Sequence, residues 1–335
     1  MNILARRSGP ARRLRLAVAG ARRQVDIALA GLVASELRRG SLSAEGAARA
    51  LERAGFHLLR KHYFLPIPDL EELPAGFWER RSELVGIDLA EDRALRLLTD
   101  VFPPYVQEFR SRFPDERSEG KPFYLLNGTF MAVDAHVLYA LIRHARPRRV
   151  LELGTGMSTL VAAAALDAGG GAGRLTSVDP FPPAGLLDGG GGRTELVRSR
   201  AEDLPLSDYT SLGRDDVLFI DSTHVLRAGG DVQFLYLEVL PRLAPGVLVH
   251  VHDVSLPREY PRTYAEHGLF WSEQYVLQAY LAFNRRVEVV WPGNALLLRH
   301  PDAMQRAFPE IERMRAAYPS SEPTSFWFRV RGADA

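Results

Sequence analysis

Two apolar stretches of this 335-residue chain end abruptly in side chains that can bind a cation or move a proton. One runs into Asp221, and the other runs into His252 and Asp253. If the two stretches are neighbouring strands, about 4.8 Å apart, these side chains converge on one point. Two carboxylates and one imidazole suit magnesium or manganese better than zinc. We therefore expect Asp221, His252 and Asp253 to bind a divalent cation or a substrate; the alternative is an internal hydrogen-bonded pair at a strand end.

His224 follows Asp221 by three positions and is our leading candidate for a general base, so His224 and Asp221 form the predicted catalytic pair. An imidazole titrates near neutral pH and can take a proton from a hydroxyl acceptor. The alternative is that His224 caps the following helix or lies on the surface. His250, two residues before His252 on the same strand face, is expected to be a core histidine.

A glycine-containing loop, Glu152-Leu153-Gly154-Thr155-Gly156, leads through Ser158 into a predicted helix. Its glycines let the backbone turn tightly and approach a ligand closely. In a dinucleotide site the third glycine of the motif would stand at Thr159, and no Lys or Arg lies between residues 152 and 166 to cradle a phosphate. The loop therefore favours a nucleoside cofactor without phosphates.

Acidic residues follow the next two predicted strands. Asp179 stands at the end of one strand, where a ribose diol would need a carboxylate. Glu202 and Asp203 follow another strand and could face an adenine edge, although a solvated loop or a helix cap explains them equally well.

These residues require an α/β fold in which short apolar strands alternate with helices. Such alternation predicts a doubly wound, mostly parallel sheet. Two further strands, at 287–291 and 325–330, are expected to form a terminal hairpin and complete seven strands, with 295–298 as the alternative last strand. The other strands are predicted at 149–153, 174–178, 194–198, 216–220 and 246–252, and helices near 134–142, 157–167, 228–243 and 272–283.

The front of the chain is predicted to be a mainly helical accessory region. Residues 11–60 favour helix, prolines between 66 and 74 break the pattern, and a helix over 89–101 is expected to end before Pro103-Pro104. The polar stretch 112–121 resembles a linker. We therefore predict an accessory domain over 1–120 and a catalytic domain over 121–335.

The order of these motifs resembles that of class I S-adenosylmethionine-dependent methyltransferases, which have a Rossmann-like sheet. The resemblance covers about residues 121–335 and rests on E-L-G-T-G, the acidic strand end, A-E-D and F-I-D-S-T-H. More narrowly, P-F-Y-L-L-N-G-T-F, V-H-V-H-D-V and W-S-E-Q-Y-V-L-Q-A-Y-L are similar to a bacterial group related to the sugar and antibiotic O-methyltransferases.

The resemblance implies that S-adenosylmethionine is the cofactor. Glu152 would orient its ammonium group, Asp179 would bind the ribose hydroxyls, and Glu202 or Asp203 would lie near adenine. A cationic ligand with a sulfonium and an ammonium group is also best served by acidic surroundings. The complete set of implied cofactor-binding residues is Glu152, Gly154, Thr155, Gly156, Ser158, Asp179, Glu202 and Asp203.

Overall composition excludes several other functions. The 42 basic and 41 acidic side chains nearly cancel, so no strong net field recruits nucleic acid, which is an unlikely partner. The chain has no cysteine, which removes disulfides and thiolate zinc sites and fits a reducing cytoplasm. No stretch approaches the roughly 18–20 apolar residues of a membrane span.

Residues 1–40 are a basic exception, with nine arginines against Asp26 and Glu36. The apolar run here is interrupted by Arg15, so a secretory signal is not expected. We expect a solvated basic helix that packs on its own domain, with membrane-surface or nucleic-acid binding as the alternatives. This accessory region could also form a homodimer interface.

Two glycine-dense loops, at 169–173 and 189–192, are expected to be flexible connectors, with a lid over the cleft as the alternative for 183–193.

The expected activity is methyl transfer from S-adenosylmethionine to a small-molecule or glycan acceptor, most simply at a hydroxyl group, with possible help from Mg²⁺ or Mn²⁺. A NAD-dependent oxidoreductase is the alternative enzyme, and a non-catalytic methyltransferase-like assembly module is the alternative without catalysis. The loops that set the acceptor cannot be read from the sequence.

Overall fold

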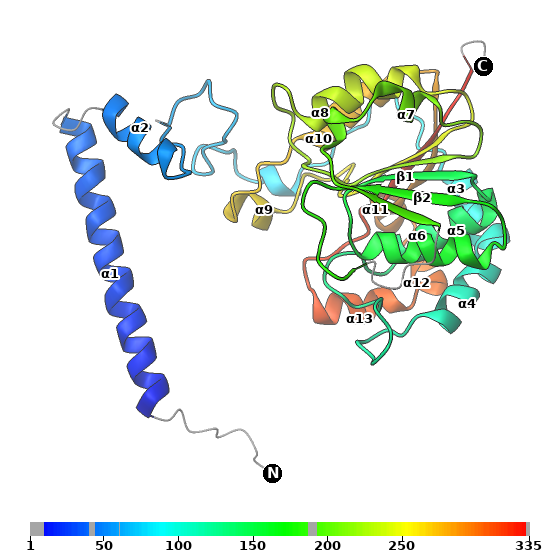
Figure 1. Cartoon of the computed structure of the whole chain (residues 1–335), viewed down its shortest axis with the longest axis horizontal. Coiled ribbons are helices and arrows are strands. Elements are labelled where there is room, and N and C mark those ends of the chain that lie inside the picture. Colours follow the sequence, from blue (N-terminus) through cyan, green and yellow to red (C-terminus); the bar gives the residue numbers. More distant parts are fainter. Residues whose placement is uncertain (1–9, 40–43, 60, 187–192, 333–335) are drawn as a thin grey trace. The chain divides into compact units, whose positions relative to one another are not determined.

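The structure is a computed structural model that describes residues 10–39, 44–59, 61–186 and 193–332. The chain divides into two compact units, Met1–Asp69 (unit 1) and Leu70–Ala335 (unit 2) (Figure 1). The glycine run 189–192, and with it most of the lid considered for 183–193, lies outside the described residues.

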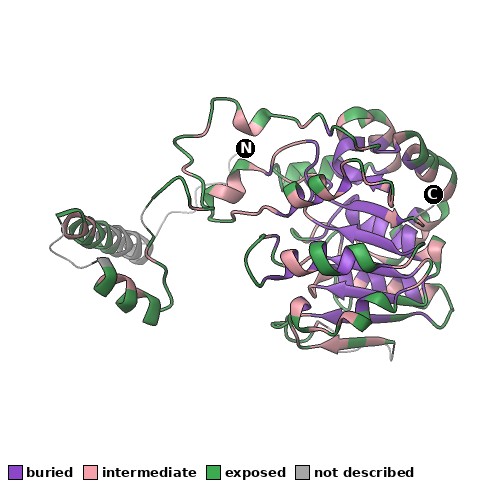
Figure 2. Cartoon of the chain, turned by 90° about the horizontal axis from the view of Figure 1, so that it is seen from above, coloured by how far each residue is buried: buried purple, intermediate pink, exposed green. Residues whose placement is uncertain are grey.

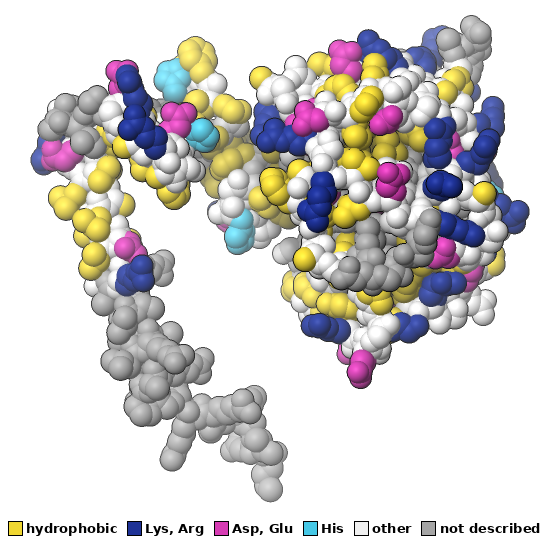
Figure 3. Space-filling view, viewed as in Figure 1, with side chains coloured by type: hydrophobic (Ala, Val, Ile, Leu, Met, Phe, Trp, Pro, Cys, Tyr) yellow, Lys and Arg dark blue, Asp and Glu magenta, His cyan; other side chains and the backbone are white. Residues whose placement is uncertain are grey.

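Unit 1 consists of two helices and a connector, as the composition of residues 11–60 indicates. The helices α1 (Pro10–Arg39) and α2 (Ala44–Arg53) are rich in Ala, Leu and Arg, which are strong helix formers. The described part of α1 exposes large apolar side chains, drawn in yellow in Figure 3: Val25, Ile27, Leu29, Leu32 and Val33. Among the described residues, no helix combines the length and apolar character needed to cross a membrane.

Unit 2 is built on one seven-stranded sheet with the order β3-β2-β1-β4-β5-β7-β6. The first five strands in this order are mutually parallel, and β7 runs antiparallel to both of its neighbours. The sheet confirms the doubly wound, mostly parallel α/β prediction. The strands are β1 (Arg149–Leu153), β2 (Arg174–Val178), β3 (Thr194–Val197), β4 (Val217–Ile220), β5 (Leu248–Val251), β6 (Val287–Pro292) and β7 (Phe326–Val330).

Helices cover both faces of this sheet, and each face has its own hydrophobic core (Figures 1 and 2). One core packs α5 (Asp134–Ala145) and α6 (Met157–Ala168) under the sheet, and the other packs α10 (Glu273–Leu281) over it. The central strands are buried on both sides, which explains why they are continuous apolar runs rather than alternating ones.

The remaining short elements connect and flank the strands. They are η1 (Phe77–Glu79), η3 (Ala201–Asp203), α7 (Leu206–Thr210), α8 (Asp231–Phe234), η4 (Leu235–Val239), η5 (Leu240–Arg242), α9 (Arg262–Glu266), α11 (Gly293–Arg299), α12 (Pro301–Ala307) and α13 (Glu310–Ala317).

The terminal hairpin forms from 287–292 and 326–330, with β7 inserted between β5 and β6. The alternative last strand, 295–298, lies instead in α11. Its apolar residues are spaced so that Ala295 packs in one core and Leu296 in the other, which a helix at the sheet margin allows.

A helical segment does end at Val101, before Pro103-Pro104, as predicted. The prediction lacked the helix α4 (Pro103–Arg112), which begins at these prolines because proline is well tolerated in the first helical turn. It continues closely from α3 (Glu91–Arg96) and the π-turn η2 (Leu97–Val101).

Along the chain, the boundary between the two compact units lies between Asp69 and Leu70, earlier than the boundary expected near residue 120. Phe102, Val106 and Phe109 are buried in the same core as α5, so residues 91–112 belong to unit 2. The polar stretch 112–121, expected to be a linker, therefore lies within unit 2.

Candidate active site

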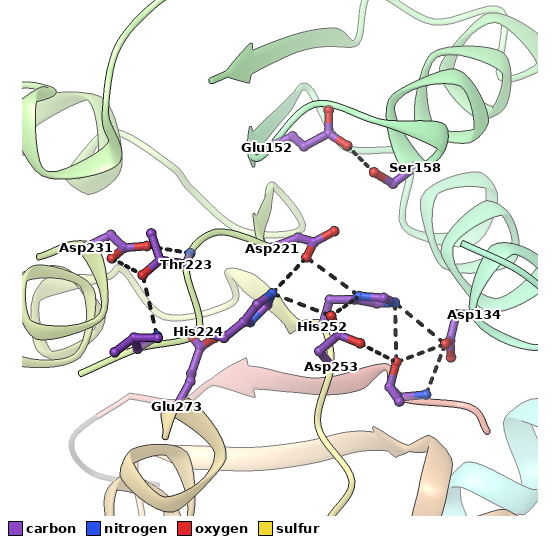
Figure 4. Close-up of polar contacts among 12 residues, drawn as sticks. Asp134, Glu152, Ser158, Asp221, Thr223, His224, Asp231, His252, Asp253 and Glu273 are labelled. Carbon is purple, nitrogen blue, oxygen red and sulfur yellow. Dashed lines mark hydrogen bonds and ion pairs between the residues drawn. The ribbon is translucent and has the colours of Figure 1, made fainter. Parts of the chain in front are cut away.

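The carboxyl ends of β1, β4 and β5 bring the predicted catalytic residues together (Figure 4). Ile220 pairs with Val251 in the sheet, so the residues that follow them, Asp221 and His252, are neighbours. The ladder continues one bond further, because the His252 N–H donates to the Ile220 carbonyl at 2.9 Å. The expected convergence at this edge is therefore present.

Asp221, His252 and Asp253 form a cluster in which one potential ligand atom from each lies within 4.8 Å of the others. His252 Nδ1 is 3.7 Å from Asp221 Oδ1 and 3.6 Å from Asp253 Oδ2. This nitrogen is buried and has no hydrogen-bond partner among the described residues. A buried nitrogen without a partner, facing two carboxylate oxygens, fits a cation ligand set.

The other side of the His252 ring is held by polar groups from distant parts of the chain. His252 Nε2 lies 3.6 Å from Asp134 Oδ2 and 3.4 Å from Thr324 Oγ1. Asp134 is itself fixed, since its two oxygens accept backbone N–H bonds from Thr324 at 2.9 Å and Ser325 at 3.1 Å. A carboxylate behind a histidine is the usual arrangement that orients a metal-binding imidazole.

His224 is buried beside this cluster, so it does not lie on the surface. Its backbone carbonyl accepts N–H bonds from Ser272 at 2.8 Å and Glu273 at 3.0 Å at the start of α10, while its side chain turns to the cluster. Its backbone has a φ of 59°, which turns the side chain back toward the strand ends. Nδ1 lies 2.8 Å from Glu273 Oε2, and Nε2 lies 3.2 Å from Asp221 Oδ1 and 3.5 Å from Asp253 Oδ2.

The carboxylates around both histidines favour their protonated forms. Burial alone would lower the pKa of His224, but its hydrogen bonds to Asp221 and Glu273 outweigh burial and raise that pKa to about 10. Burial also disfavours charge on His252, yet the nearby Asp253 and Asp221 raise its pKa. Burial would raise the pKa of Asp221, but His252 and His224 lower it well below its usual range.

These shifts change the expectation for His224. With a pKa of about 10 and both nitrogens facing carboxylates, His224 carries its proton at neutral pH in this arrangement. It can accept another group's proton only when the negative charge of Asp221 and Asp253 is offset. The electrostatics therefore link the predicted base to the predicted cation site.

Gly154 is required by the fold itself. It has a φ of 96°, and a Cβ built there would lie 1.9 Å from the Asp221 carbonyl oxygen. The β1–α6 turn thus passes directly against the end of β4. Gly156 differs, because no atom lies within 4 Å of a Cβ built on it, which leaves open space at the start of α6.

Glu152 is turned into the protein, where hydroxyl groups surround its carboxylate. Its Oε1 accepts a hydrogen bond from Ser158 at 2.7 Å, and its Oε2 accepts bonds from Thr159 and Ser177 at 2.7 Å each. Burial raises the pKa of Glu152 to about 7 despite these three donors. The residue therefore ties the glycine loop and α6 to the sheet, and its expected contact with an ammonium group would compete with these bonds.

A cavity of about 290 Å³ opens beside the glycine loop. Of the predicted cofactor residues, Gly154, Asp179 and Glu202 line it, and so does Asp221. Asp179 accepts a backbone N–H bond from Thr155 at 2.9 Å, which closes the loop against the end of β2. The other five predicted cofactor residues do not line this cavity: Glu152, Thr155, Gly156, Ser158 and Asp203.

A second cavity, of about 510 Å³, reaches the same cluster. Asp134, Asp253 and Thr324 line its inner end. Asp221 therefore borders the first cavity and Asp253 the second, with His224 and His252 within 3.2–3.7 Å of both carboxylates.

Sequence reasoning missed two parts of this site. Glu273 stood in a segment interpreted as aromatic core, although a carboxylate at the first turn of a helix was a usable signal. Thr324 carries no sequence signal, because only the return of β7 to its place between β5 and β6 brings Thr324 beside His252.

A comparison with known families decides the class of the domain. Residues 151–254 match the sequence model of a family described as a methyltransferase domain. This range runs from β1 past β5 and contains both the glycine loop and the Asp221, His252 and Asp253 cluster. This part of the chain is therefore similar to a methyltransferase domain. Asp134, Glu273 and Thr324, which support the cluster of this methyltransferase domain, lie outside the matched range.

Other proteins resemble the methyltransferase domain more distantly. An uncharacterized protein of Archaeoglobus fulgidus is 34% identical over 106 residues, which is 30% of this chain and 48% of that protein, so the match spans about half of this curated relative. Among solved structures, S-adenosylhomocysteine-bound PaMTH1, a methyltransferase of Podospora anserina, has 16% identity and a TM-score of 0.39, over 70% of this chain and 88% of its own. Cofactor-bound Rv0187 from MTB has 20% identity and a TM-score of 0.39, over 61% and 83%.

Proposed function

We propose that this protein transfers a methyl group from S-adenosylmethionine to a hydroxyl group of a small-molecule or glycan acceptor, assisted by a divalent cation. One observation carries the proposal: the Asp221, His252 and Asp253 cluster lies between two cavities. The cavity beside Gly154 and Asp179 suits the cofactor, which leaves the cavity beside Asp253 for the acceptor.

Methyl transfer is a displacement at carbon, so the protein must align the acceptor oxygen with the methyl group and remove the hydroxyl proton. When bound, Mg²⁺ or Mn²⁺ supplies positive charge that lowers the pKa of an acceptor hydroxyl. Asp221, His252 and Asp253 would hold the ion, with Asp134 and Thr324 orienting the His252 ring.

His224 is the proposed acceptor of the hydroxyl proton. Glu273 holds its Nδ1 and directs Nε2 toward the cluster. Because Asp221 and Asp253 raise the pKa of His224, the base is available only when their charge is offset. Glu273 is thus a positioning residue, while His224 is the catalytic one.

The cation site can be tested by titrating Mn²⁺ into chelator-treated protein while following its electron paramagnetic resonance signal. We expect saturable binding by the natural protein and a large loss of affinity in Asp253→Asn. The exposed helical residue Glu238 provides a control, because Glu238→Gln removes a carboxylate far from the cluster. Equal Mn²⁺ binding by Asp253→Asn and the natural protein would contradict the assigned ligands.

The alternatives have weaker support. In a NAD-dependent oxidoreductase, a glycine at position 159 would complete the dinucleotide-binding motif. Thr159 stands there instead; it is buried, and its hydroxyl donates a hydrogen bond to Glu152. A non-catalytic assembly module would have no need of the His224, Glu273 and Asp221 arrangement. A thermal-shift comparison of S-adenosylmethionine with NAD separates the two cofactors directly.

A further inference from the structure

The candidate active site leaves unit 1 without a role, because no described residue of unit 1 lines either of its two cavities. We propose that unit 1 binds the surface of a membrane that contains anionic phospholipid. Its apolar side chains would enter the bilayer interface, and its arginines would meet the phosphate headgroups. This inference does not depend on the proposed function.

Charge is divided unevenly between the two units. Unit 1 has 13 Lys and Arg residues against 5 Asp and Glu residues, whereas unit 2 has 29 against 36. Their net charges are therefore +8 and −7, although the whole chain is nearly neutral. A negatively charged surface attracts unit 1 and repels unit 2, so unit 1 is the part of the chain that such a surface binds.

Unit 1 also exposes much apolar surface for its length. Of the nineteen large apolar side chains that are exposed among the described residues, ten lie in its 69 residues. On α1, the exposed Val25, Leu29 and Leu32 have the i, i+4, i+7 spacing of a single helix face (Figure 3). The exposed Arg22 precedes this face and the exposed Arg38 follows it. Arginines in such places can bury their stems in lipid while the charged group reaches a phosphate.

The connector after α2 adds exposed aromatic rings. Tyr63 is 81% exposed and Phe64 is 77% exposed. Their ring centroids are 4.1 Å apart, and the His62 ring lies 4.6 Å from that of Tyr63, so the three rings pack on one another. Side chains with an apolar body and a polar tip, such as tyrosine, concentrate at the boundary between lipid and water.

A membrane surface satisfies both properties of unit 1. A helix with an apolar face and many arginines binds in the plane of the interface, where burial of apolar area and attraction to anionic lipid act together. A nucleic acid would meet the arginines but leave the aliphatic and aromatic side chains in water. A second copy of unit 1 would cover the apolar side chains but bring +8 against +8.

The test is flotation of the full chain with lipid vesicles. One set of vesicles contains phosphatidylcholine alone, and the other contains phosphatidylcholine and phosphatidylglycerol in equal amounts. We expect saturable binding to the anionic vesicles and binding weaker by about tenfold or more to phosphatidylcholine alone. Binding to the anionic vesicles should fall as the salt concentration rises, because salt screens the attraction to the headgroups.

Two double variants separate the contributions of charge and apolar surface. Arg22→Glu with Arg38→Glu reverses two exposed charges, and Tyr63→Ser with Phe64→Ser removes two exposed rings. Each pair should weaken binding to the anionic vesicles by about tenfold or more. Circular dichroism equal to that of the natural protein shows that the helices of each variant are intact.

Matched controls come from exposed residues of unit 2. Arg285→Glu reverses a charge, and Phe283→Ser removes a ring that is 77% exposed. Neither change should alter vesicle binding, because unit 2 is not the proposed binding surface.

Absence of binding to the anionic vesicles, equal binding to both kinds of vesicle, or binding that neither unit 1 variant weakens would overturn the inference. Two further measurements can also overturn it. One is tighter binding to a DNA duplex than to the anionic vesicles, weakened by the arginine pair alone, which would make unit 1 a nucleic-acid-binding region. The other is sedimentation velocity that shows a dimer, lost in the aromatic pair, without vesicle binding, which would make it a self-association surface.

Discussion

At the scale of single residues, the site contains carboxylates with different tasks. Asp221 and Asp253 face the space between the cavities, whereas Glu152 satisfies hydroxyl groups inside the protein. The sequence predicted all three as functional because each follows or ends a buried strand. Which way each one turns depends on its neighbours, and a strand pattern does not contain that information.

The buried Glu152 makes stability depend on pH. Its pKa is about 7 in the folded protein, above the ordinary value of 4.5, so the folded state holds this proton more tightly than the unfolded state. The stability that the proton contributes is present below about pH 4.5 and is lost as pH rises through 7. Relative to Glu152→Gln, the natural protein should lose roughly 2–4 kcal/mol between pH 5 and pH 8.

Urea unfolding of both proteins at the two pH values measures this difference. Glu238→Gln, at an exposed position of η4, corrects for general changes with pH. If Glu152→Gln and the natural protein showed parallel pH dependence, the carboxylate would be ionised throughout and its environment would be more polar than described.

Asp179 is the residue assigned to the cofactor ribose. Asp179→Ala should weaken S-adenosylhomocysteine binding by roughly 1.5–3 kcal/mol, since a charged acceptor is lost. Asp203→Ala is the matched control, because Asp203 is exposed and does not line the cofactor cavity. Calorimetry that gave equal dissociation constants for Asp179→Ala and the natural protein would place the ribose elsewhere.

At the scale of elements, the strands of unit 2 were predictable because their apolar runs are short and bounded by polar residues or glycine. The helix α4 was missed for a physical reason. A proline can end a preceding helix, but it can also occupy the first turn of a new helix, as Pro103 does. The role of Gly154 was also hidden, because the clash that excludes a side chain comes from β4, more than 60 residues later in the chain.

The two loop glycines should respond differently to substitution. Gly154→Ala would place a Cβ against the Asp221 carbonyl at a positive φ, so we expect a loss of roughly 2–4 kcal/mol in unfolding free energy. Gly156→Ala meets open space and should cost under about 1 kcal/mol.

Binding completes this comparison. Gly156→Ala should bind S-adenosylhomocysteine as the natural protein does, because Gly156 does not line the cofactor cavity. Thermal unfolding of both alanine variants and calorimetry on Gly156→Ala test these statements. Equal stability of Gly154→Ala and Gly156→Ala would show that the turn is looser than its contacts indicate.

At the scale of the whole molecule, the catalytic unit begins at residue 70 and not near residue 120. The sequence suggested the later boundary because polar residues and prolines punctuate 112–121. Burial of Phe102 and Phe109 against α5 shows instead that these markers lie inside a folded unit.

Truncation distinguishes the two boundaries. A chain that starts at Leu70 keeps both hydrophobic cores and should unfold cooperatively and bind S-adenosylhomocysteine as the full chain does. A chain that starts at Lys121 loses α3, η2 and α4 and should be insoluble or unfolded, because it exposes the α5 face that they cover. A stable, binding-competent product from the second truncation alone would restore the later boundary.

The central claim is that the cavity beside Gly154 and Asp179 binds S-adenosylmethionine independently of the cation cluster. The most direct test is calorimetric titration of S-adenosylhomocysteine into the full chain in excess chelator. The account predicts saturable binding to one site per chain, retained in Asp253→Asn and weakened in Asp179→Ala, because Asp179 lines this cavity. Absence of binding by the natural protein, or equal binding by folded Asp179→Ala, would contradict it.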